Sequence, residues 1–462
     1  MGRSDGLQHP ALTTDLYHPD AAYVSWRAGR NGLTTFDLYS RKAPFGGSYM
    51  LVAGLAEALA RVREFRYTDD DLAYLKQARG YDVGFLHALR ELRFSGDIWA
   101  MPEGSIAFPN EPMLRVTAPF QEALLLESTL LQAVNLATLI ATKASRITWA
   151  AQGRPVAEFA LRRAQNPMVV ARSGRIGGCV STSYLAAALK FGLPPSGTIP
   201  HALVQLFDDE LTAFESVAEA FERYTLLIDT YDVRRAIHLA ADVAHRYHAS
   251  HGHTLAAVRL DSGDLVADAR YVRGVLDAAG LPDVRVLGSG DLDEYRIAEI
   301  LAQGAPFDAF GVGTSLGVGG GSPAHGVEGG ALGGVYKEAF YVDEAGRATP
   351  KIKVAGEKST LPGVKQVFRQ DGFGGDVIQL ASEAAPSDGS RPLLRPVMLG
   401  GEQCPGATPT LDEIAEYAWA QIAGLPDQFR QLERPETYPV VFSAGIQRLR
   451  DTAILERERR LR

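Results

Sequence analysis

Short apolar runs in the middle of the chain end in polar or glycine-rich residues and are followed by helical patterns. The run Leu226–Ile228 precedes helical spacing at Arg234–Tyr247, and the run Leu255–Val258 leads into "RLDSGDL". The stretches "PVAEFALRRAQ", "DVRVLGSGDLDEYRIAEILAQG" and "FDAFGVGTSLGVGGGS" follow the same scheme. Repeated strand–loop–helix units are typical of a parallel sheet. Because each expected strand carries polar residues at its C-terminal end, the pattern predicts an α/β barrel with its active site there.

The first part of the chain mixes strand-like and helical stretches instead. Thr34–Lys42 alternates as a strand does, and Tyr49–Phe65 has helical spacing. Glu122–Ala144 is the most apolar long stretch, but its polar residues recur three or four positions apart. This spacing predicts a buried helix rather than a membrane span.

These patterns divide the chain into three parts. We predict an N-terminal α+β domain over residues 1–130, an irregular TIM-like α/β barrel over 131–345, and a small C-terminal region over 346–462 that packs on the other two. In the last region, Thr410 is placed as the N-cap of a helix that begins with "LDEIAEYAW".

Composition and charge narrow the possible partners. The chain has 462 residues, of which 22% are charged, and its net charge of −8 argues against nucleic acid as the main partner. An anionic ligand would therefore need a local basic site. The two cysteines, Cys179 and Cys404, are too few for a disulfide framework or a zinc site and favour a reduced, cytoplasmic setting. The first residues lack the apolar core of a secretion signal.

Two glycine-rich turns are candidate phosphate sites. "GSGD", Gly288–Asp291, and "FGVGTS", Phe310–Ser315, each follow an expected strand. Backbone N–H groups in such turns can bind phosphate, although many glycine turns bind nothing. Neither turn has the GxGxxG spacing and later acidic residue of a dinucleotide site.

Individual side chains give weaker signals. Arg162 and Arg163 follow another expected strand, and paired guanidinium groups suit a diphosphate, although a surface salt bridge is an equally good interpretation. His201 lies among apolar residues in "SGTIPHALVQLF", where a core role is the commoner one for histidine. Tyr17 is one aromatic residue among many.

An ordered set of motifs resembles the nicotinate phosphoribosyltransferase family. "LTTDLYHPDAAYVSW" and "FDLYSRKAPFGGSYMLVAGL" resemble its opening, and the later motifs follow in the family's order: "FALRRAQ", "SGTIPHALVQLF", "LIDTYDV", "VRLDSGDL", "GSGDLDE", "FGVGTSL", "LGGVYKEAF" and "KSTLPGVKQVFR". The resemblance runs from about Leu12 to about residue 450. Its most specific part is "RLDSGDL" together with the GTxxH segment.

The resemblance implies a reaction and an assembly. Nicotinate would attack C1 of 5-phosphoribosyl 1-diphosphate, giving nicotinate mononucleotide and diphosphate, as a step of NAD biosynthesis. ATP hydrolysis through a phosphorylated histidine would drive this step, and Mg²⁺ would travel on the diphosphate rather than in a protein cage. The implied fold is that of the type II phosphoribosyltransferases. The implied assembly is a cytoplasmic homodimer with shared active sites, without nucleic acid or membrane as a partner.

The resemblance also assigns roles to residues. Asp261 matches the family's ribose-facing acid, Arg259 would contact nicotinate or the phosphates, and His201 matches the phosphorylated histidine. Tyr17 would stack on the pyridine ring from the neighbouring subunit, and the two glycine turns would hold the 5-phosphate. The implied substrate-binding residues are Tyr17, Arg162, Thr198, Asp264, Gly290, Asp291, Gly313 and Thr314.

The identity of the base rests on one position. Relatives that use nicotinamide have an Asp where this chain has Ser183, and an anionic Asp would repel nicotinate, so Ser183 favours the acid. A phosphoribosyltransferase for nicotinamide or another heteroaromatic base stays an alternative. Relatives that use quinolinate are shorter and more basic, so they fit less well.

Several positions depart from the family's pattern. Pro200 and Ala202 flank His201 where Ala and Ser are usual, Tyr184 replaces a common Asn, and Pro19 lies in the opening helix. The segment "NPMVVARSGRI" is about three residues shorter than expected. A non-catalytic paralogue that binds nucleotide is therefore a further alternative, and the intact Arg259, Asp261 and Asp264 argue against it.

Overall fold

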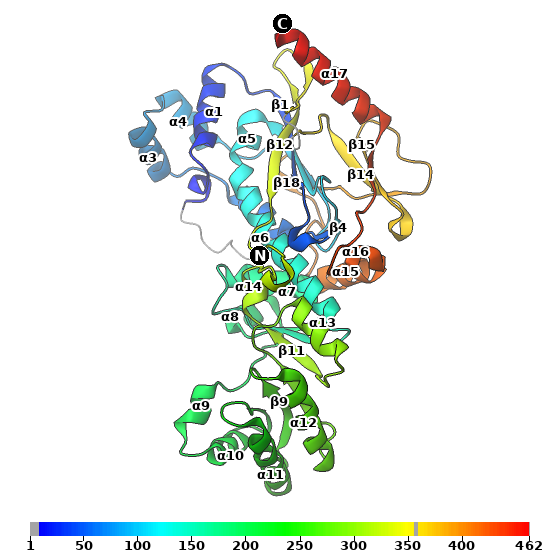
Figure 1. Ribbon diagram of the computed structural model, residues 1–462. Coiled ribbons are helices and arrows are strands. Elements are labelled where there is room, and N and C mark those ends of the chain that lie inside the picture. The colour runs from blue at the N-terminus through cyan, green and yellow to red at the C-terminus, as the bar shows by residue number, and fades with distance from the viewer. Residues whose placement is uncertain (1–8, 355–358, 462) are drawn as a thin grey trace. The chain divides into compact units, whose positions relative to one another are not determined.

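The structure is a computed structural model that describes residues 9–354 and 359–461 (Figure 1). Contacts group the chain into two compact units, which we call unit 1, Met1–Leu139 with Ala331–Arg462, and unit 2, Ile140–Gly330. The two ends of the chain thus contribute to one unit. The division into three regions, with boundaries at residues 130 and 345, stays a prediction.

Unit 2 is built on a six-stranded parallel sheet in the order β7-β6-β11-β10-β9-β8. Apolar strand residues such as Val156, Leu226, Val258 and Val312 are at most 1% exposed, so they form its core. The strands are β6 (Val156–Glu158), β7 (Ser181–Thr182), β8 (Arg223–Leu227), β9 (Thr254–Leu260), β10 (Arg285–Gly288) and β11 (Ala309–Val312).

The strand order is that of a six-stranded barrel opened between β7 and β8. The strands follow one another around the sheet in chain order from β6 to β11, and the last strand, β11, pairs with the first, β6. A closed TIM barrel has eight strands, so the sheet is the irregular version of that architecture. The predicted α/β class and the parallel sheet are confirmed.

A loop covers the open position between β7 and β8. The Thr182 N–H of β7 donates to the Pro194 carbonyl at 3.2 Å, and the Ser196 N–H donates back to the Thr182 carbonyl at 2.9 Å. At the other end of this loop, His201 Nδ1 lies 3.1 Å from the hydroxyl of Thr230, which follows β8. The segment from Pro194 to His201 therefore passes from the end of one edge strand to the end of the other.

Aspartate residues at the ends of loops start four helices of unit 2. Asp209, Asp232, Asp264 and Asp293 each accept a hydrogen bond from the backbone N–H three residues later, at 2.8 to 3.1 Å. Some of the polar residues that follow the strands therefore serve as N-caps of helices. The helices of unit 2 are α7 (Pro167–Ile176), α8 (Leu185–Phe191), α9 (His201–Leu206), α10 (Glu210–Ala220), α11 (Val233–His251), α12 (Leu265–Ala278), α13 (Glu294–Ala302) and α14 (Thr314–Gly317).

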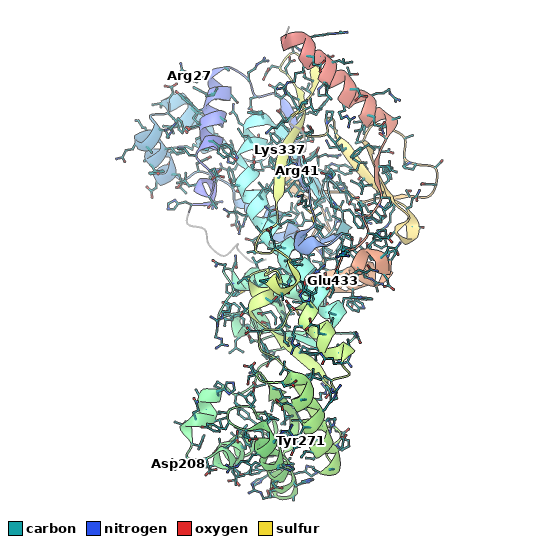
Figure 2. The ribbon with its side chains drawn as sticks, viewed as in Figure 1. Arg27, Arg41, Asp208, Tyr271, Lys337 and Glu433 are labelled. Carbon is teal, nitrogen blue, oxygen red and sulfur yellow. The ribbon has the colours of Figure 1, made fainter. Side chains whose placement is uncertain are left out.

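The outer face of unit 2 carries a contact between two of these helices. His238 of α11 lies 3.2 Å from the hydroxyl of Tyr271 on α12, and the Arg234 guanidinium lies 4.5 Å from the centre of the Tyr271 ring. Tyr271 is labelled in Figure 2. Their inner faces are apolar, with Ile237 and Val272 fully buried. These helices therefore pack their apolar faces against strands β9 and β10 of the sheet.

Unit 1 contains a seven-stranded antiparallel sheet in the order β13-β12-β1-β5-β3-β17-β18. Its strands are β13 (Ala348–Pro350), β12 (Gly334–Val342), β1 (Leu33–Ser40), β5 (Leu114–Pro119), β3 (Asp97–Ala100), β17 (Arg395–Leu399) and β18 (Glu402–Gln403). A second sheet consists of β16 (Arg391–Pro392), β14 (Lys365–Arg369), β15 (Asp376–Leu380) and β19 (Val440–Phe442). A small ladder joins β2 (Met50–Leu51) to β4 (Ile106–Ala107).

Helices complete unit 1. They are α1 (Tyr17–Arg27), α2 (Leu55–Glu64), α3 (Asp69–Arg79), α4 (Val83–Glu91), α5 (Phe120–Leu125), α15 (Leu411–Gly424), α16 (Asp427–Arg430) and α17 (Ala444–Leu461), while α6 (Glu127–Ala150) contributes residues to both units. The expected N-cap Thr410 is confirmed, because its hydroxyl accepts from the Glu413 N–H and the Glu413 carboxylate accepts from the Thr410 N–H.

Two helix predictions are wrong at their boundaries. The expected helix Tyr49–Phe65 contains strand β2 first, and Gly54 at φ +95° separates it from α2. The expected helix Glu122–Ala144 is interrupted at Leu126, which ends α5 before α6 begins. In the part of the chain that the structure describes, no helix has the length and apolarity to cross a membrane.

Candidate active site

A cavity of about 560 Å³ lies at the C-terminal ends of the parallel strands of unit 2. The loops after β6, β9, β10 and β11 line it, together with the segment that joins β7 to β8. This is the position in which α/β barrels collect functional groups. The sequence-predicted residues that line the cavity are Arg162, Thr198, His201, Arg259, Asp261, Gly290, Asp291, Gly313 and Thr314.

Arg259 and Asp261 form the centre of a hydrogen-bonded network at the end of β9. Arg259 Nη2 lies 2.5 Å from Asp261 Oδ1, and the Ser289 hydroxyl donates to the same oxygen at 2.6 Å. Arg259 Nε donates to Ser289 Oγ at 2.7 Å, and Arg259 Nη1 donates to Thr198 Oγ1 at 2.8 Å. Ser289 therefore fixes the cation and the anion relative to each other.

The network keeps Asp261 negatively charged. Burial opposes its ionisation, but the hydrogen bond from Ser289 and the charge of Arg259 outweigh burial and lower the pKa of the Asp261 carboxyl from its ordinary value. Asp261 Oδ2 lies 3.9 Å from His201 Nε2. The cavity thus places a fixed carboxylate beside an imidazole and a guanidinium.

His201 is the first residue of α9 and is held on both sides. Its Nδ1 is within hydrogen-bonding distance of the Thr230 hydroxyl, and its Nε2 is directed toward Asp261. The side chain is 41% exposed. It is therefore accessible from the cavity and is not the core residue that its apolar neighbours in the sequence favoured.

The two glycine turns approach other backbone segments closely. Gly290 has φ +82°, and a Cβ there would lie 1.8 Å from the Asp261 carbonyl oxygen. At the other turn, a Cβ on Gly311 would lie 2.3 Å from the ring of Phe159, and one on Gly313 would lie 3.2 Å from the Phe159 carbonyl oxygen. Glycine is required at Gly290 and Gly311 because any side chain would displace a wall of the cavity.

Arg162 and Arg163 lie in the turn after β6 and are both exposed. The Arg163 N–H donates to the Ala160 carbonyl at 2.8 Å, which closes the turn and directs both residues to the cavity wall. Two cations at the rim give the cavity the local positive charge that an anionic substrate needs in a chain of net charge −8.

Two of the predicted site residues lie elsewhere. Asp264 does not line the cavity, and its carboxylate is used as the N-cap of α12, where it accepts from the Ala267 N–H. Tyr17 belongs to unit 1, at the start of α1, and is 56% exposed. The positions of Asp264 and Tyr17 neither support nor contradict the roles that the resemblance assigns to them.

Sequence analysis missed residues that hold the site together. Asp229, after β8, accepts from the Asp261 N–H at 2.8 Å and from the Ser262 hydroxyl at 2.7 Å. Glu158, at the end of β6, accepts from the Ala160 N–H and from the Thr182 hydroxyl of β7, and burial raises its pKa. Asp229 follows its strand as Asp261 does, so the shared pattern could have identified it.

Within the described residues, no group of three or more His, Cys, Asp or Glu side chains has the arrangement of a metal site. The acidic groups at the strand ends instead pair with hydroxyls, backbone N–H groups and Arg259.

Comparison with known proteins agrees with this geometry. Residues 12–135 match the model of the nicotinate phosphoribosyltransferase N-terminal domain, and residues 388–450 match that of its C-terminal domain. The nicotinate phosphoribosyltransferase pncB2 of Mycobacterium tuberculosis is 40% identical, over 94% of this chain and 92% of its own length. That of Bacillus subtilis is 36% identical, over 94% and 93%.

A solved structure supports the same assignment. The crystal structure of human nicotinic acid phosphoribosyltransferase superposes with a TM-score of 0.82 at 30% identity and covers 95% of this chain and 99% of that one. The sequence comparison and the structure comparison thus both match this chain to such enzymes along nearly its whole length. The chain belongs to the nicotinate phosphoribosyltransferase family.

Proposed function

We propose that this chain transfers the 5-phosphoribosyl group of 5-phosphoribosyl 1-diphosphate to nicotinate, as an enzyme of NAD biosynthesis. The pyridine nitrogen forms a bond to C1 of the ribose, and the bond from C1 to the diphosphate oxygen breaks, with the electron pair leaving on the diphosphate. The observation that carries this proposal is the network of Arg259, Asp261 and Ser289 between two glycine turns, in a cavity rimmed by arginine.

The fixed charges suit this chemistry. Displacement at C1 develops positive charge on the ribose, and a carboxylate that is already ionised and held in place stabilises that charge without reorganising. Asp261 meets this requirement because Ser289 and Arg259 favour its anion. Arg162 would bind the diphosphate, and the backbone at Gly290 and Gly313 would hold the 5-phosphate.

Ser183 favours nicotinate over nicotinamide. Ser183 lines the cavity, and its N–H donates to the Glu158 carbonyl at 2.9 Å, so its position is fixed by the first strand of the sheet. A hydroxyl can donate to the carboxylate of nicotinate, whereas an Asp at this position would repel it.

The proposal includes ATP coupling and magnesium. His201 Nε2, the nitrogen on the cavity side, would attack the γ-phosphorus of ATP, and the bond to the bridging oxygen would break with ADP as the leaving group. Thr230 would fix the ring through Nδ1. The described residues offer no metal cage, which is compatible with Mg²⁺ that enters on the diphosphate and neutralises part of its charge. We further propose a cytoplasmic homodimer in which Tyr17 contributes to the partner's site.

A coupled assay tests the reaction. Purified protein is incubated with nicotinate, 5-phosphoribosyl 1-diphosphate and Mg²⁺, with and without ATP, and nicotinate mononucleotide is separated by chromatography. We expect nicotinate mononucleotide in both conditions and more of it with ATP. The variant Arg162→Ala should raise KM for the phosphoribosyl donor. Faster turnover of nicotinamide would favour the amide-using alternative. Binding of the donor without any turnover would favour a non-catalytic nucleotide-binding paralogue.

His201→Ala tests the coupling separately. We expect this variant to lose ATP stimulation and to keep part of the ATP-independent synthesis, because the cavity that binds the ribose and phosphates is unchanged. Thr230→Val is the positioning control, and it should weaken ATP stimulation less than His201→Ala does. Unchanged ATP dependence in His201→Ala would remove the phosphohistidine role.

A further inference from the structure

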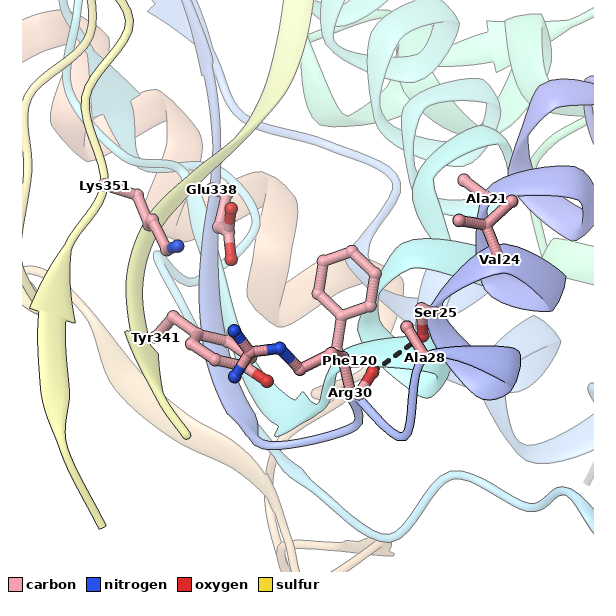
Figure 3. A pocket seen from close by; sticks show the side chains of 9 residues that line it. All are labelled: Ala21, Val24, Ser25, Ala28, Arg30, Phe120, Glu338, Tyr341 and Lys351. Atoms are coloured by element: carbon pink, nitrogen blue, oxygen red, sulfur yellow. Dashed lines mark hydrogen bonds between the residues drawn. The ribbon is translucent and has the colours of Figure 1, made fainter. Parts of the chain in front are cut away.

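Unit 1 contains a second cavity, of about 600 Å³, that the proposed reaction does not use. It lies between α1 and the edge strands of the seven-stranded sheet, and Figure 3 shows the ring of Phe120 between these two walls. Its volume is in the range of small-molecule sites. All of its lining residues belong to unit 1, so it is separate from the cavity at the strand ends of unit 2.

One wall of this cavity is apolar. Val24 of α1 and Ala28, the C-cap of that helix, are exposed and line it, and Phe120 presents its ring (Figure 3). Val24 is 66% exposed and therefore offers apolar surface to a ligand in this cavity. A flat aromatic group would remove this surface from water and could stack on the Phe120 ring.

The opposite wall carries charges that are incompletely paired. Glu338 of β12 accepts one hydrogen bond, from the Thr34 hydroxyl at 3.0 Å, and its second oxygen has no protein partner among the described residues. The Lys351 ammonium lies 4.9 Å from the centre of the Tyr341 ring and, in the described chain, forms no direct ion pair with Glu338. Burial raises the pKa of the Glu338 carboxyl, and the charge of Lys351 only partly opposes this shift. Half-buried charges without close partners are costly, and a complementary ligand would reduce that cost.

Arg30 adds a second cation at the rim of this cavity. Its nearest carboxylate, Glu344, is 3.8 Å away and both side chains are well exposed, so the pair is weak and easily exchanged for a stronger anion. The Arg30 carbonyl accepts from the Ser25 hydroxyl at 2.7 Å, which fixes the backbone beneath the guanidinium (Figure 3).

We infer that this cavity binds a nucleoside monophosphate whose base carries an exocyclic amino group. The base stacks on Phe120 and donates an amino hydrogen to Glu338, and the phosphate contacts Arg30 and Lys351. A carboxylate accepts from an amino group but repels a carbonyl oxygen, so Glu338 selects amino-substituted bases. This ligand would cover the apolar wall, donate to the Glu338 carboxylate and pair with both cations.

The test compares two nucleotides that differ at one group. Adenosine 5′-monophosphate has an amino group where inosine 5′-monophosphate has a carbonyl, and both are titrated into the full chain by calorimetry. We expect adenosine monophosphate to bind about tenfold more tightly, because the inosine nucleotide places a carbonyl opposite Glu338 and would have to shift on Phe120 before its N1–H could donate. Adenosine and inorganic phosphate alone should each bind more weakly than the nucleotide.

Variants locate the binding. Glu338→Gln should abolish the preference, since an amide can donate to the carbonyl of the inosine nucleotide, and Arg30→Ala should weaken both nucleotides about tenfold. Arg27→Ala is the matched control, because Arg27 is an exposed arginine of α1, close in sequence to Arg30, that does not line the cavity. Arg162→Ala should leave unchanged the part of the binding that Arg30→Ala removes, since Arg162 lies in the other cavity.

Three results would overturn the inference: no binding of adenosine monophosphate, an unchanged preference in Glu338→Gln, or loss of binding in Arg162→Ala but not in Arg30→Ala. None of these measurements depends on turnover. A failure here is therefore distinguishable from a failure of the proposed phosphoribosyl transfer, which the coupled assay measures separately.

Discussion

Ser289 is a third partner that contacts both members of the direct Arg259–Asp261 ion pair in the candidate active site. Its hydroxyl donates to Asp261 and accepts from Arg259, so a single oxygen connects two strand ends. The residue does no chemistry in the proposed reaction. Its contribution is to keep Asp261 ionised and correctly oriented before the substrate arrives.

Ser289→Ala should make the enzyme sensitive to acid. Without the donated hydrogen bond, the pKa of Asp261 rises toward its ordinary value, so the carboxylate is lost at a higher pH on acidification. We expect kcat/KM to fall about tenfold at the acidic end of the profile and much less near neutrality. Ser262→Ala is the control, because the Ser262 hydroxyl donates to Asp229 rather than to Asp261. Identical pH profiles for Ser289→Ala and the parent would contradict the positioning role.

Glu210 is a buried carboxylate whose titration should affect stability. Its side chain is 7% exposed, and one of its oxygens is buried without a hydrogen-bond partner among the described residues. Burial raises its pKa to about 7, with Arg235 opposing and Asp232 and Asp229 reinforcing the shift. The folded state therefore binds this proton more tightly than the unfolded state does, and its stabilising effect is lost as pH rises from about 5 through 7.

Glu210→Gln removes this titration. The variant should have nearly the free energy of unfolding of the parent at pH 5 and a higher one at pH 8, where the parent must bury an anion. Urea denaturation at the two pH values measures the difference. A stability difference between variant and parent that is independent of pH would show that Glu210 does not titrate in this range.

At the scale of elements, the strand-end pattern explains what sequence analysis could and could not find. Repeated strand–loop–helix units correctly predict the parallel sheet and most of the cavity wall. They cannot separate a capping aspartate from a ligand-facing one, because Asp264 and Asp261 follow the same strand and differ only in the direction of the side chain. Strand β7 has two residues, which is too short for any periodicity.

Gly290→Ala tests how tightly the turn after β10 is packed. The new Cβ would meet the Asp261 carbonyl oxygen at 1.8 Å in addition to the strain of φ +82°, so the turn and Asp261 must both move. We expect a loss of at least about 3 kcal/mol in the free energy of unfolding and almost no turnover. Chemical denaturation and the coupled assay measure both.

Gly280 supplies the matched control for this turn. It has φ +72°, but a Cβ added there would have nothing within 4 Å, so Gly280→Ala adds strain without a clash. It should cost about 1 kcal/mol and leave turnover unchanged. Equal effects of the two substitutions would mean that backbone strain alone, and not the contact with Asp261, makes glycine necessary at position 290.

At the scale of the whole molecule, segments distant in sequence form one sheet. Strand β12 pairs with β1 across some three hundred residues, from Leu33 with Val342 to Ser40 with Gly334. Local periodicity predicts each strand but contains no information on this pairing, which depends on tertiary packing. From the sequence we expect the C-terminal region to pack on the other parts of the chain, but the pairing of β12 with β1 is visible only in the structure.

Subunit complementation tests the proposed sharing of active sites. Tyr17 belongs to unit 1, and Asp261 belongs to the cavity of unit 2, so Tyr17→Ala and Asp261→Asn damage different units. If each site combines Tyr17 of one subunit with Asp261 of the other, a mixed dimer contains one intact site and one doubly damaged site. Refolding equal amounts of the two variants together should then recover about a quarter of the parent's turnover.

The recovered activity distinguishes sharing from other arrangements. If sites are shared, half of the dimers formed at random are mixed, and each mixed dimer has one of its two sites intact. If each site is built within a single subunit, every site in the mixture carries one substitution. Mixing without unfolding is the control, because subunits that do not exchange should give no recovery. Turnover of the refolded mixture equal to the mean of the separate variants would place Tyr17 outside the neighbouring site and leave the phosphoribosyl chemistry of the cavity unaffected.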